Sequence, residues 1–250
     1  MRLEHKVAVV YGAAGSMGGA VARAYAREGA WVFLAGRSLP ALDAVAEAIR
    51  AAGGRVERAV VDVDDEPAVE RHADEMVQQA GRIDISFNAA GMDAVQGVPL
   101  VEMTLDDFMA PIVEAARRHF VTARTAARRM IAQRSGTIVT LSSSAALEWR
   151  HQMGGFNLAC ACIEALTRSL AGEVGRSGVR VVCVRPNFTP ETRPGLSDAD
   201  PQLQPLLADT ALGRLPRLDE VSDAAVFAAS DGAGAMSGAV LNLTCGAIAD

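Results

Sequence analysis

Short apolar runs rich in β-branched residues alternate with Ala-rich stretches of helical periodicity along the whole chain. The apolar runs predict strands at residues 6–10, 31–35, 56–61, 83–87, 137–141, 179–184 and 240–243. The stretches between them predict helices at residues 20–27, 40–52, 66–80, about 105–133, 156–175 and 220–229. This alternation predicts an α/β fold: a single doubly wound parallel sheet of seven strands, Rossmann-like, with helices on both faces.

Two parts of this pattern are irregular. Thr104 is placed to cap the long helix that follows it, and Pro111 predicts a kink or a later start because proline lacks a backbone N–H. Residues 186–218 are Pro-rich, and we expect them to form a lid over the site with one or two short helices, inside a single domain spanning residues 1–250. In the helix at 156–175, one apolar and small face is formed by Leu158, Cys162, Ala165, Leu166 and Ser169.

The composition narrows the classes of function. The chain has 250 residues, half of them apolar, and a formal net charge of -6, so it can bury a full core but has no basic block for nucleic acid. No apolar run approaches the roughly 18–20 residues that cross a bilayer, and the N-terminus lacks a signal-peptide stretch. The four cysteines have neither disulfide-framework nor zinc spacing, so no metal site is expected. We therefore expect a cytoplasmic globular protein that binds a small-molecule substrate, and neither nucleic acid nor membrane.

The first cofactor candidates follow the first predicted strand. In a doubly wound sheet, ligands bind outside the carboxyl ends of the strands. Small residues there let the backbone approach a pyrophosphate, and the next helix adds its dipole and free N–H groups. A plain tight turn is the alternative for this segment alone. The candidate residues of the turn are Gly12, Ala14, Gly15, Ser16, Met17 and Gly18.

Further candidates follow the next three strands. Gly36 stands where NAD-type sites usually have a carboxylate, and it is followed at once by Arg37 and Ser38. These two residues favour a 2′-phosphate, although a solvated surface arginine is the alternative. Asp62 is placed to accept from an adenine amino group, and Val63 to pack on the ring. The joint occurrence at successive strand ends predicts an NADP(H) site, preferred over NAD because of Arg37. The fourth strand is followed by Asn88, Ala89, Ala90 and Gly91.

These segments resemble the short-chain dehydrogenase/reductase family, and the resemblance covers essentially the whole chain. The family's Thr-Gly-x-x-x-Gly-x-Gly turn lies over residues 11–18, where Gly12 and Gly18 match. Its adenine motif matches at 62–63, its Asn-Asn-Ala-Gly motif appears at 88–91, and its Pro-Gly after the sixth strand appears as Pro186-Asn187. The resemblance implies an NADP(H)-binding oxidoreductase for a carbonyl or alcohol. It also implies a homodimer or homotetramer assembled through the helices at about 105–133 and 156–175.

The resemblance also locates the family's catalytic residues. The catalytic serine falls on Ser143, for which satisfying backbone groups at the strand end is the alternative role. The Tyr-x-x-x-Lys pair falls on Phe156 and Cys160, and the family's asparagine falls on Ala115. Phe156 has no exchangeable proton, and Cys160 is short and uncharged. Because general acid–base catalysis is typically worth about 10²–10⁴-fold, the family's mechanism should be strongly weakened.

Other residues are candidates to replace the missing groups. His151 and Glu148 lie in the loop at 144–155. Histidine is the side-chain type most suited to proton transfer near neutral pH, although a surface histidine is the alternative. Cys160 and Cys162 are either reactive thiols or small apolar packing. Lys6 is the only lysine, so no other lysine can replace the family's lysine. Arg150 and Arg185 are the other cations considered for that role.

Three hypotheses follow from these residues. The first is an NADP(H)-dependent oxidoreductase with altered catalytic residues. The second is a non-redox enzyme on the same scaffold, such as a dehydratase, isomerase or cyclase. The third is a catalytically silent nucleotide-binding subunit that pairs with an active partner.

Overall fold

The computed structural model describes residues 1–193, 195–196 and 200–250. Seven strands form one sheet in the order β3-β2-β1-β4-β5-β6-β7, and every neighbouring pair is parallel. The expected doubly wound sheet is therefore confirmed. The strands are β1 (Val7–Tyr11), β2 (Trp31–Gly36), β3 (Arg55–Val60), β4 (Ile85–Asn88), β5 (Gly136–Leu141), β6 (Val179–Pro186) and β7 (Val240–Leu243).

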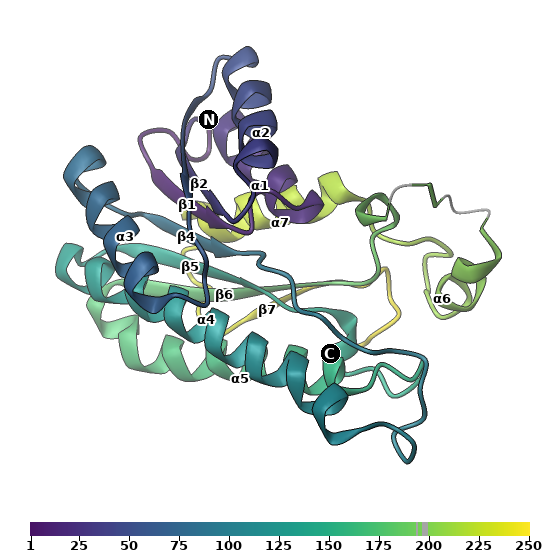
Figure 1. The fold of residues 1–250 in the computed structure, drawn as a ribbon. Helices are drawn as coiled ribbons and strands as arrows, with labels where there is room; N and C mark the ends of the chain where they lie inside the picture. The colour runs from purple at the N-terminus through teal and green to yellow at the C-terminus, as the bar shows by residue number, and fades with distance from the viewer. Residues whose placement is uncertain (194, 197–199) are drawn as a thin grey trace.

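Helices cover both faces of the sheet (Figure 1). Helices α1 (Ser16–Arg27), α2 (Leu39–Ala51) and α7 (Leu218–Ala229) lie together on one face, and α3 (Glu66–Ala80), α4 (Leu105–Gln133) and α5 (Gly155–Val174) lie on the other. Each face has its own cluster of buried apolar side chains, as expected for a sheet that is covered on both sides. No helix in the described part of the chain has the length and apolar character needed to span a bilayer.

Most element boundaries lie within two residues of those the pattern predicts, and the start of α1 differs by four. Helix α1 begins at Ser16 rather than at residue 20, because Gly18 packs directly against the Gly12 carbonyl and therefore belongs to the helix instead of the turn. Helix α4 begins at residue 105, so the later start that Pro111 suggested is wrong. Thr104 caps α4 as expected, accepting a hydrogen bond from the Asp107 N–H at 3.1 Å. Strand β6 continues to residue 186 instead of ending at 184.

The two sides of α5 have different environments. Ala159 and Ile163 are fully buried and pack toward the sheet. The apolar and small face identified from the sequence points outward, with Leu158 48% exposed and Cys162 and Leu166 half-buried. That face is therefore only partly covered by the rest of the chain.

The carboxyl ends of β1 and β4 form the switch point of the sheet. The chain leaves β1 into α1 on one face and leaves β4 toward α4 on the other, so the two connections diverge and open a crevice between them. Residues 186–218 are named here the 186–218 segment, which begins at the last residue of β6. Its described part, without residues 194 and 197–199, extends beyond the same edge (Figure 1). This segment contains α6 (Gln204–Ala208) and two single-turn 3-10 helices, at 190–192 and 201–203.

Candidate active site

A first cavity of about 330 Å³ lies at the carboxyl ends of β1 to β4. Its walls come from four separate strand ends, which the parallel sheet aligns along one edge. Most of the predicted cofactor residues line it, namely Gly12, Ala14, Gly15, Arg37, Ser38, Asp62, Val63, Ala89, Ala90 and Gly91.

The turn after β1 depends on glycine because it touches the turn after β4. Gly12 has a φ of +73°, and a Cβ there would lie 2.5 Å from the carbonyl carbon of Ala89. Gly15 precedes α1 and contributes no side-chain cap, so no capping side chain satisfies the first N–H groups of that helix. A bare helix N-terminus at a cavity is suited to an anion such as a pyrophosphate.

Five predicted cofactor residues lie outside the lining of this cavity. Met17 packs partly against the apolar core beneath α1. Asn88 is buried and shapes the turn after β4, since its Nδ2 donates to Thr122 Oγ1 at 2.8 Å and its Oδ1 accepts from the Ala90 N–H at 2.8 Å. Its position supports the cavity wall without facing the cavity. The five are Ser16, Met17, Gly18, Asn88 and Pro186.

The structure adds two residues that the sequence did not indicate, Asp64 and Arg118. Arg118 of α4 donates to the Asp64 carboxylate from Nε and Nη2, at 3.0 and 2.8 Å, and from Nη1 to the Gly91 carbonyl. This hydrogen-bonded arginine is the main reason why the pKa of Asp64 is lowered, and the charge of the exposed Arg37 acts in the same direction. The pair closes one rim of the cavity. It joins positions 54 residues apart, so no local motif could have revealed it.

A second cavity, of about 540 Å³, opens beside the end of β5. Ser143, His151 and Phe156 line it together, as the sequence predicted for the substrate side. Side chains of the 186–218 segment form the opposite wall, among them Leu203 and Leu206. The lining of the cavity is mixed, because polar and charged side chains such as Arg193 and Asp209 stand beside the apolar ones.

Three consecutive serines follow β5, and their hydroxyls differ in their hydrogen-bond partners. Ser142 donates to Glu164 Oε1 at 2.8 Å, and Ser144 donates to Asn187 Oδ1 at 3.1 Å. Ser143 only accepts, from the Ala145 N–H at 3.3 Å, so among the described residues its hydroxyl proton has no acceptor. Of the three, Ser143 is the serine that can donate to a ligand in the second cavity.

The positions that the resemblance aligns with the family's tyrosine, lysine and asparagine are apolar. Phe156 forms a wall of the second cavity. Cys160 is 1% exposed, and burial raises the pKa of its thiol to about 12, so it remains a neutral packing group. Ala115 is also buried and packs in an apolar cluster with Ile163. Burial raises the pKa of Cys162 as well, which argues against a reactive thiol there.

Two further cations that the sequence analysis considered, Arg185 and Lys6, are paired with carboxylates. Arg185 is buried and donates to both oxygens of Glu164, at 2.8 and 2.9 Å, and also pairs with Asp250. Lys6 directly precedes β1, at the amino end of the strands and away from both cavities. Its Nζ lies 3.6 Å from Asp231 Oδ1. Neither side chain is placed to contact a ligand in the two cavities.

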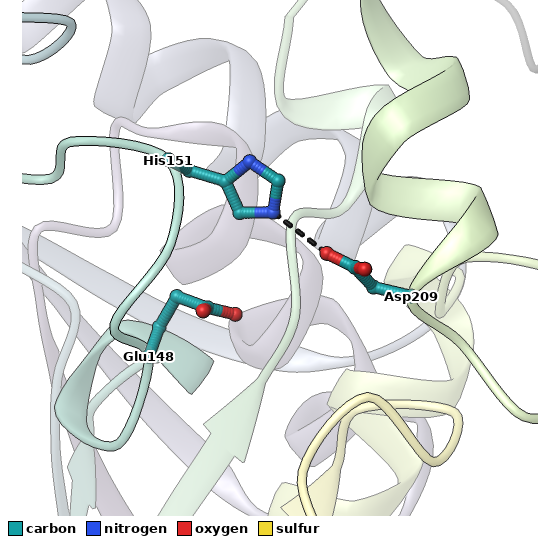
Figure 2. A group of neighbouring side chains, drawn as sticks. All are labelled: Glu148, His151 and Asp209. Carbon is teal, nitrogen blue, oxygen red and sulfur yellow. Dashed lines mark hydrogen bonds and ion pairs between the residues drawn. The ribbon is translucent and has the colours of Figure 1, made fainter.

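His151 is held by a carboxylate from the 186–218 segment. Its Nε2 lies 2.7 Å from Asp209 Oδ2, and Figure 2 shows the imidazole directed at that carboxylate, with Glu148 on the same loop. Arg150 bridges the two acidic groups, with Nε 2.8 Å from Glu148 Oε1 and Nη1 2.7 Å from Asp209 Oδ1. The sequence singled out His151 but gave no sign of Asp209, which is 58 residues away.

Comparison with known proteins places this site in a family. A family profile described as enoyl-(acyl carrier protein) reductase matches residues 12–247. A 3-oxoacyl-[acyl-carrier-protein] reductase of Thermotoga maritima is 30% identical over 99% of this chain and 100% of its own.

Two solved structures share the fold over nearly their whole length. A gluconate 5-dehydrogenase from Burkholderia cenocepacia, in complex with NADP and tartrate, is 27% identical with a TM-score of 0.87 and covers 96% of this chain and 94% of its own. An NAD+-bound xylitol dehydrogenase is 25% identical with a TM-score of 0.86. The match covers 96% of this chain and 98% of that one. From the extent of the profile match and the full-length relative, the chain belongs to the short-chain dehydrogenase/reductase family of oxidoreductases.

Proposed function

We propose that this protein is an NADP(H)-dependent oxidoreductase that interconverts a carbonyl compound and an alcohol by a modified proton-transfer route. The observation that carries the proposal is the first cavity, where four strand ends converge and Arg37 stands at the end of β2 with no carboxylate at that position. Relatives with bound NADP and with bound NAD+ share the fold, so the coenzyme class is expected and the choice between the two rests on Arg37.

The residues of the first cavity fit a dinucleotide. The close backbone approach at Gly12 and the uncapped start of α1 suit a pyrophosphate. Val63 offers an apolar surface for the adenine, and Arg37 with Ser38 offers charge-assisted hydrogen bonds for a 2′-phosphate. When bound, the nicotinamide would supply or accept the hydride.

The second cavity supplies the groups that act on the substrate. The Ser143 hydroxyl has a free proton and is placed to donate to a carbonyl oxygen, which polarises the bond. Phe156 excludes water but can neither give nor accept a proton, and the buried Cys160 thiol stays protonated at neutral pH. These two residues correspond to the family's Tyr-Lys pair, so the proton must come from elsewhere in the cavity.

A coenzyme titration tests the proposal. We expect NADPH to quench the intrinsic fluorescence of the protein with saturation, and NADH to bind about tenfold or more weakly, since one charge-assisted contact is worth roughly 1.5–3 kcal/mol. Oxidation of NADPH with ethyl pyruvate, benzaldehyde and related carbonyl compounds is then followed by absorbance. A protein that binds neither coenzyme would refute the proposal.

Two alternative functions, a non-redox enzyme and a silent nucleotide-binding subunit, are supported by the same observation. Of positions 115, 156 and 160, only Phe156 lines the second cavity, and the one titratable group among them is the buried thiol of Cys160. The double substitution Phe156→Tyr with Cys160→Lys distinguishes the candidates. If the natural protein binds NADPH without turnover and the double variant gains turnover, the natural residues have silenced a complete pocket. Product formation with no net consumption of coenzyme would instead indicate the non-redox enzyme.

A further inference from the structure

A cluster of charged side chains lies over the second cavity. His151, Glu148 and Arg150 belong to the loop at 144–155, whereas Asp209 follows α6 in the 186–218 segment. His151, Glu148 and Asp209 line the same cavity as Ser143. The cluster therefore joins two segments of the chain beside the cavity that Ser143 also lines.

Arg150 fixes the carboxylates of this cluster. It donates to both oxygens of Glu148, at 2.8 and 3.0 Å, and its Nη1 lies 2.7 Å from Asp209 Oδ1. Burial alone would raise the pKa of Glu148, but the hydrogen bonds from Arg150 outweigh burial and lower it. Asp209 is thus held by the guanidinium through one oxygen and presents the other to His151 Nε2 at 2.7 Å.

The loop that carries His151 is held at several points. His151 and Gln152 both have left-handed backbones, with φ values of +63° and +48°, which non-glycine residues seldom adopt. The Gln152 carbonyl accepts from the Gly97 N–H at 2.9 Å, and the Glu148 carbonyl accepts from Asn157 Nδ2 at 2.7 Å. The imidazole is therefore oriented before any substrate arrives.

The arrangement suits proton transfer better than metal binding. Ligand-type atoms of Glu148, His151 and Asp209 do lie within 4.8 Å of one another. However, Arg150 already occupies both carboxylates, so a cation would have to displace a guanidinium from each of them. Among the residues that the structure describes, His151 Nδ1 has no hydrogen-bond partner, which leaves it as the ring nitrogen available to a ligand.

We propose that His151 and Asp209 form the proton-transfer pair of this active site, in which Asp209 holds Nε2 and Nδ1 exchanges a proton with the substrate oxygen. The inference rests on the proposed oxidoreductase function. In reduction, the carbonyl carbon receives the hydride that NADPH supplies, and the carbonyl oxygen takes the proton from Nδ1. The imidazolium becomes neutral imidazole and regains its proton from water. Oxidation reverses each transfer, and Ser143 steadies the same oxygen in both directions.

This assignment predicts opposite pH dependences for the two directions. Reduction requires the imidazolium and should slow as pH rises, whereas oxidation requires the neutral ring and should slow as pH falls. The charged groups around the ring are Asp209 from the 186–218 segment, with Glu148 and Arg150 from its own loop, and Arg193, which lines the same cavity. Asp209 is a positioning residue, and His151 is the catalytic one.

Substitution with chemical rescue tests the pair. We expect His151→Gln to lower kcat for the reduction of ethyl pyruvate by about 10²-fold, to abolish the pH dependence and to leave NADPH binding unchanged. His151→Gly should lose as much, and added imidazole should restore at least tenfold of that loss, which a purely structural role would not allow. The matched control is His5→Gln, because His5 also has a left-handed backbone, with a φ of +63°, but its side chain is 90% exposed. Asp209→Asn should lower kcat less and shift the pH profile.

The outcomes separate this inference from the proposed function. If the wild type reduces carbonyl probes and His151→Gln retains more than half of its kcat, the pair is refuted and the oxidoreductase function stands. If the wild type binds NADPH but reduces no probe, both the pair and the redox reaction are contradicted, while the coenzyme site remains. If NADPH does not bind, the proposed function itself fails.

Discussion

Arg37 directly follows β2, at the rim of the first cavity, and its side chain is exposed and without an ion pair among the described residues. We expect Arg37→Ala to raise the Kd for NADPH by about tenfold or more and to leave the Kd for NADH nearly unchanged, because only NADPH carries the 2′-phosphate. Fluorescence titration measures both constants. Arg50→Ala, which removes another exposed arginine from α2, is the control. An equal loss for both coenzymes would mean that Arg37 does not read the phosphate.

Two buried histidines should make the folded state sensitive to acid. Burial lowers the pKa of His72 and of His119 from 6.5 to about 4. The unfolded chain therefore takes up protons at a higher pH than the folded chain, so the stability these groups contribute is present above about pH 6.5 and is lost as pH falls toward 4. Each histidine corresponds to roughly 3 kcal/mol over that window.

Urea unfolding between pH 7.5 and 4.5 checks this slope. His72→Phe and His119→Leu should each remove part of the loss, whatever their effect on stability at neutral pH. His5→Gln, at an exposed position, should leave the slope as it is. A wild type with the same unfolding free energy at both ends of the range would show that the two rings are not neutral and buried.

For single residues, the sequence predicted which side chains meet at the carboxyl ends of the strands. It did not predict side-chain contacts between segments far apart in the chain. Ten cofactor candidates meet in one cavity because parallel strands align their carboxyl ends, so the position after each strand sufficed. The partner of His151 was out of reach, since Asp209 approaches only through the fold of the 186–218 segment. Arg118 was missed for the same reason, because its contact with Asp64 crosses from α4 to the end of β3.

At the scale of the elements, α4 and α5 lie in close contact at Gly155. A Cβ at Gly155 would overlap the Phe108 carbonyl oxygen of α4, so Gly155→Ala must push the start of α5 away. We expect a loss of about 1–3 kcal/mol of unfolding free energy, typical of overpacking, together with displacement of the adjoining Phe156 wall. Thermal and urea denaturation measure the change.

Gly172 of the same helix is the matched control for this prediction. A Cβ there would meet nothing within 4 Å, so Gly172→Ala should stabilise α5 by about 0.5–1 kcal/mol through the lower entropy of the unfolded chain. Equal effects of the two substitutions would contradict the close approach at Gly155.

Elements with strong local signals were predicted well. Helix α3 has the predicted bounds, because Asp65 caps its first turn and Gly81 ends it with a left-handed φ of +80°. The start of α1 was misjudged, since Gly18 reads locally as a turn residue and only its packing on Gly12 shows that it is helical. The 186–218 segment was predicted only as a lid with one or two short helices, and its described part contains α6 and two 3-10 helices. Its contact with the loop at 144–155 has no local signal in the sequence.

At the scale of the whole molecule, α4 and α5 leave an apolar surface facing outward, called here the α4/α5 face. Its side chains are 40–73% exposed, far more than the core of the same helices, and follow one stripe of α4 onto α5. They are Leu105, Met109, Val113, Phe120 and Leu158. Apolar surface of this kind favours association of copies. We propose that the protein forms a homodimer or homotetramer through this face.

Measurement of the molar mass in solution tests the assembly. The wild type should elute from size exclusion, with light scattering, at twice or four times the 26.1 kDa of one chain. Val113→Arg places a charge in the middle of the α4/α5 face and should shift the mass toward a single chain, since an unpaired buried charge strongly opposes association. Val60→Arg alters a residue of similar exposure, 59% against 54%, at the end of edge strand β3, and should leave the mass unchanged. A wild type of one-chain mass, or an assembly that tolerates Val113→Arg, would place the contact elsewhere or show that the face serves another partner.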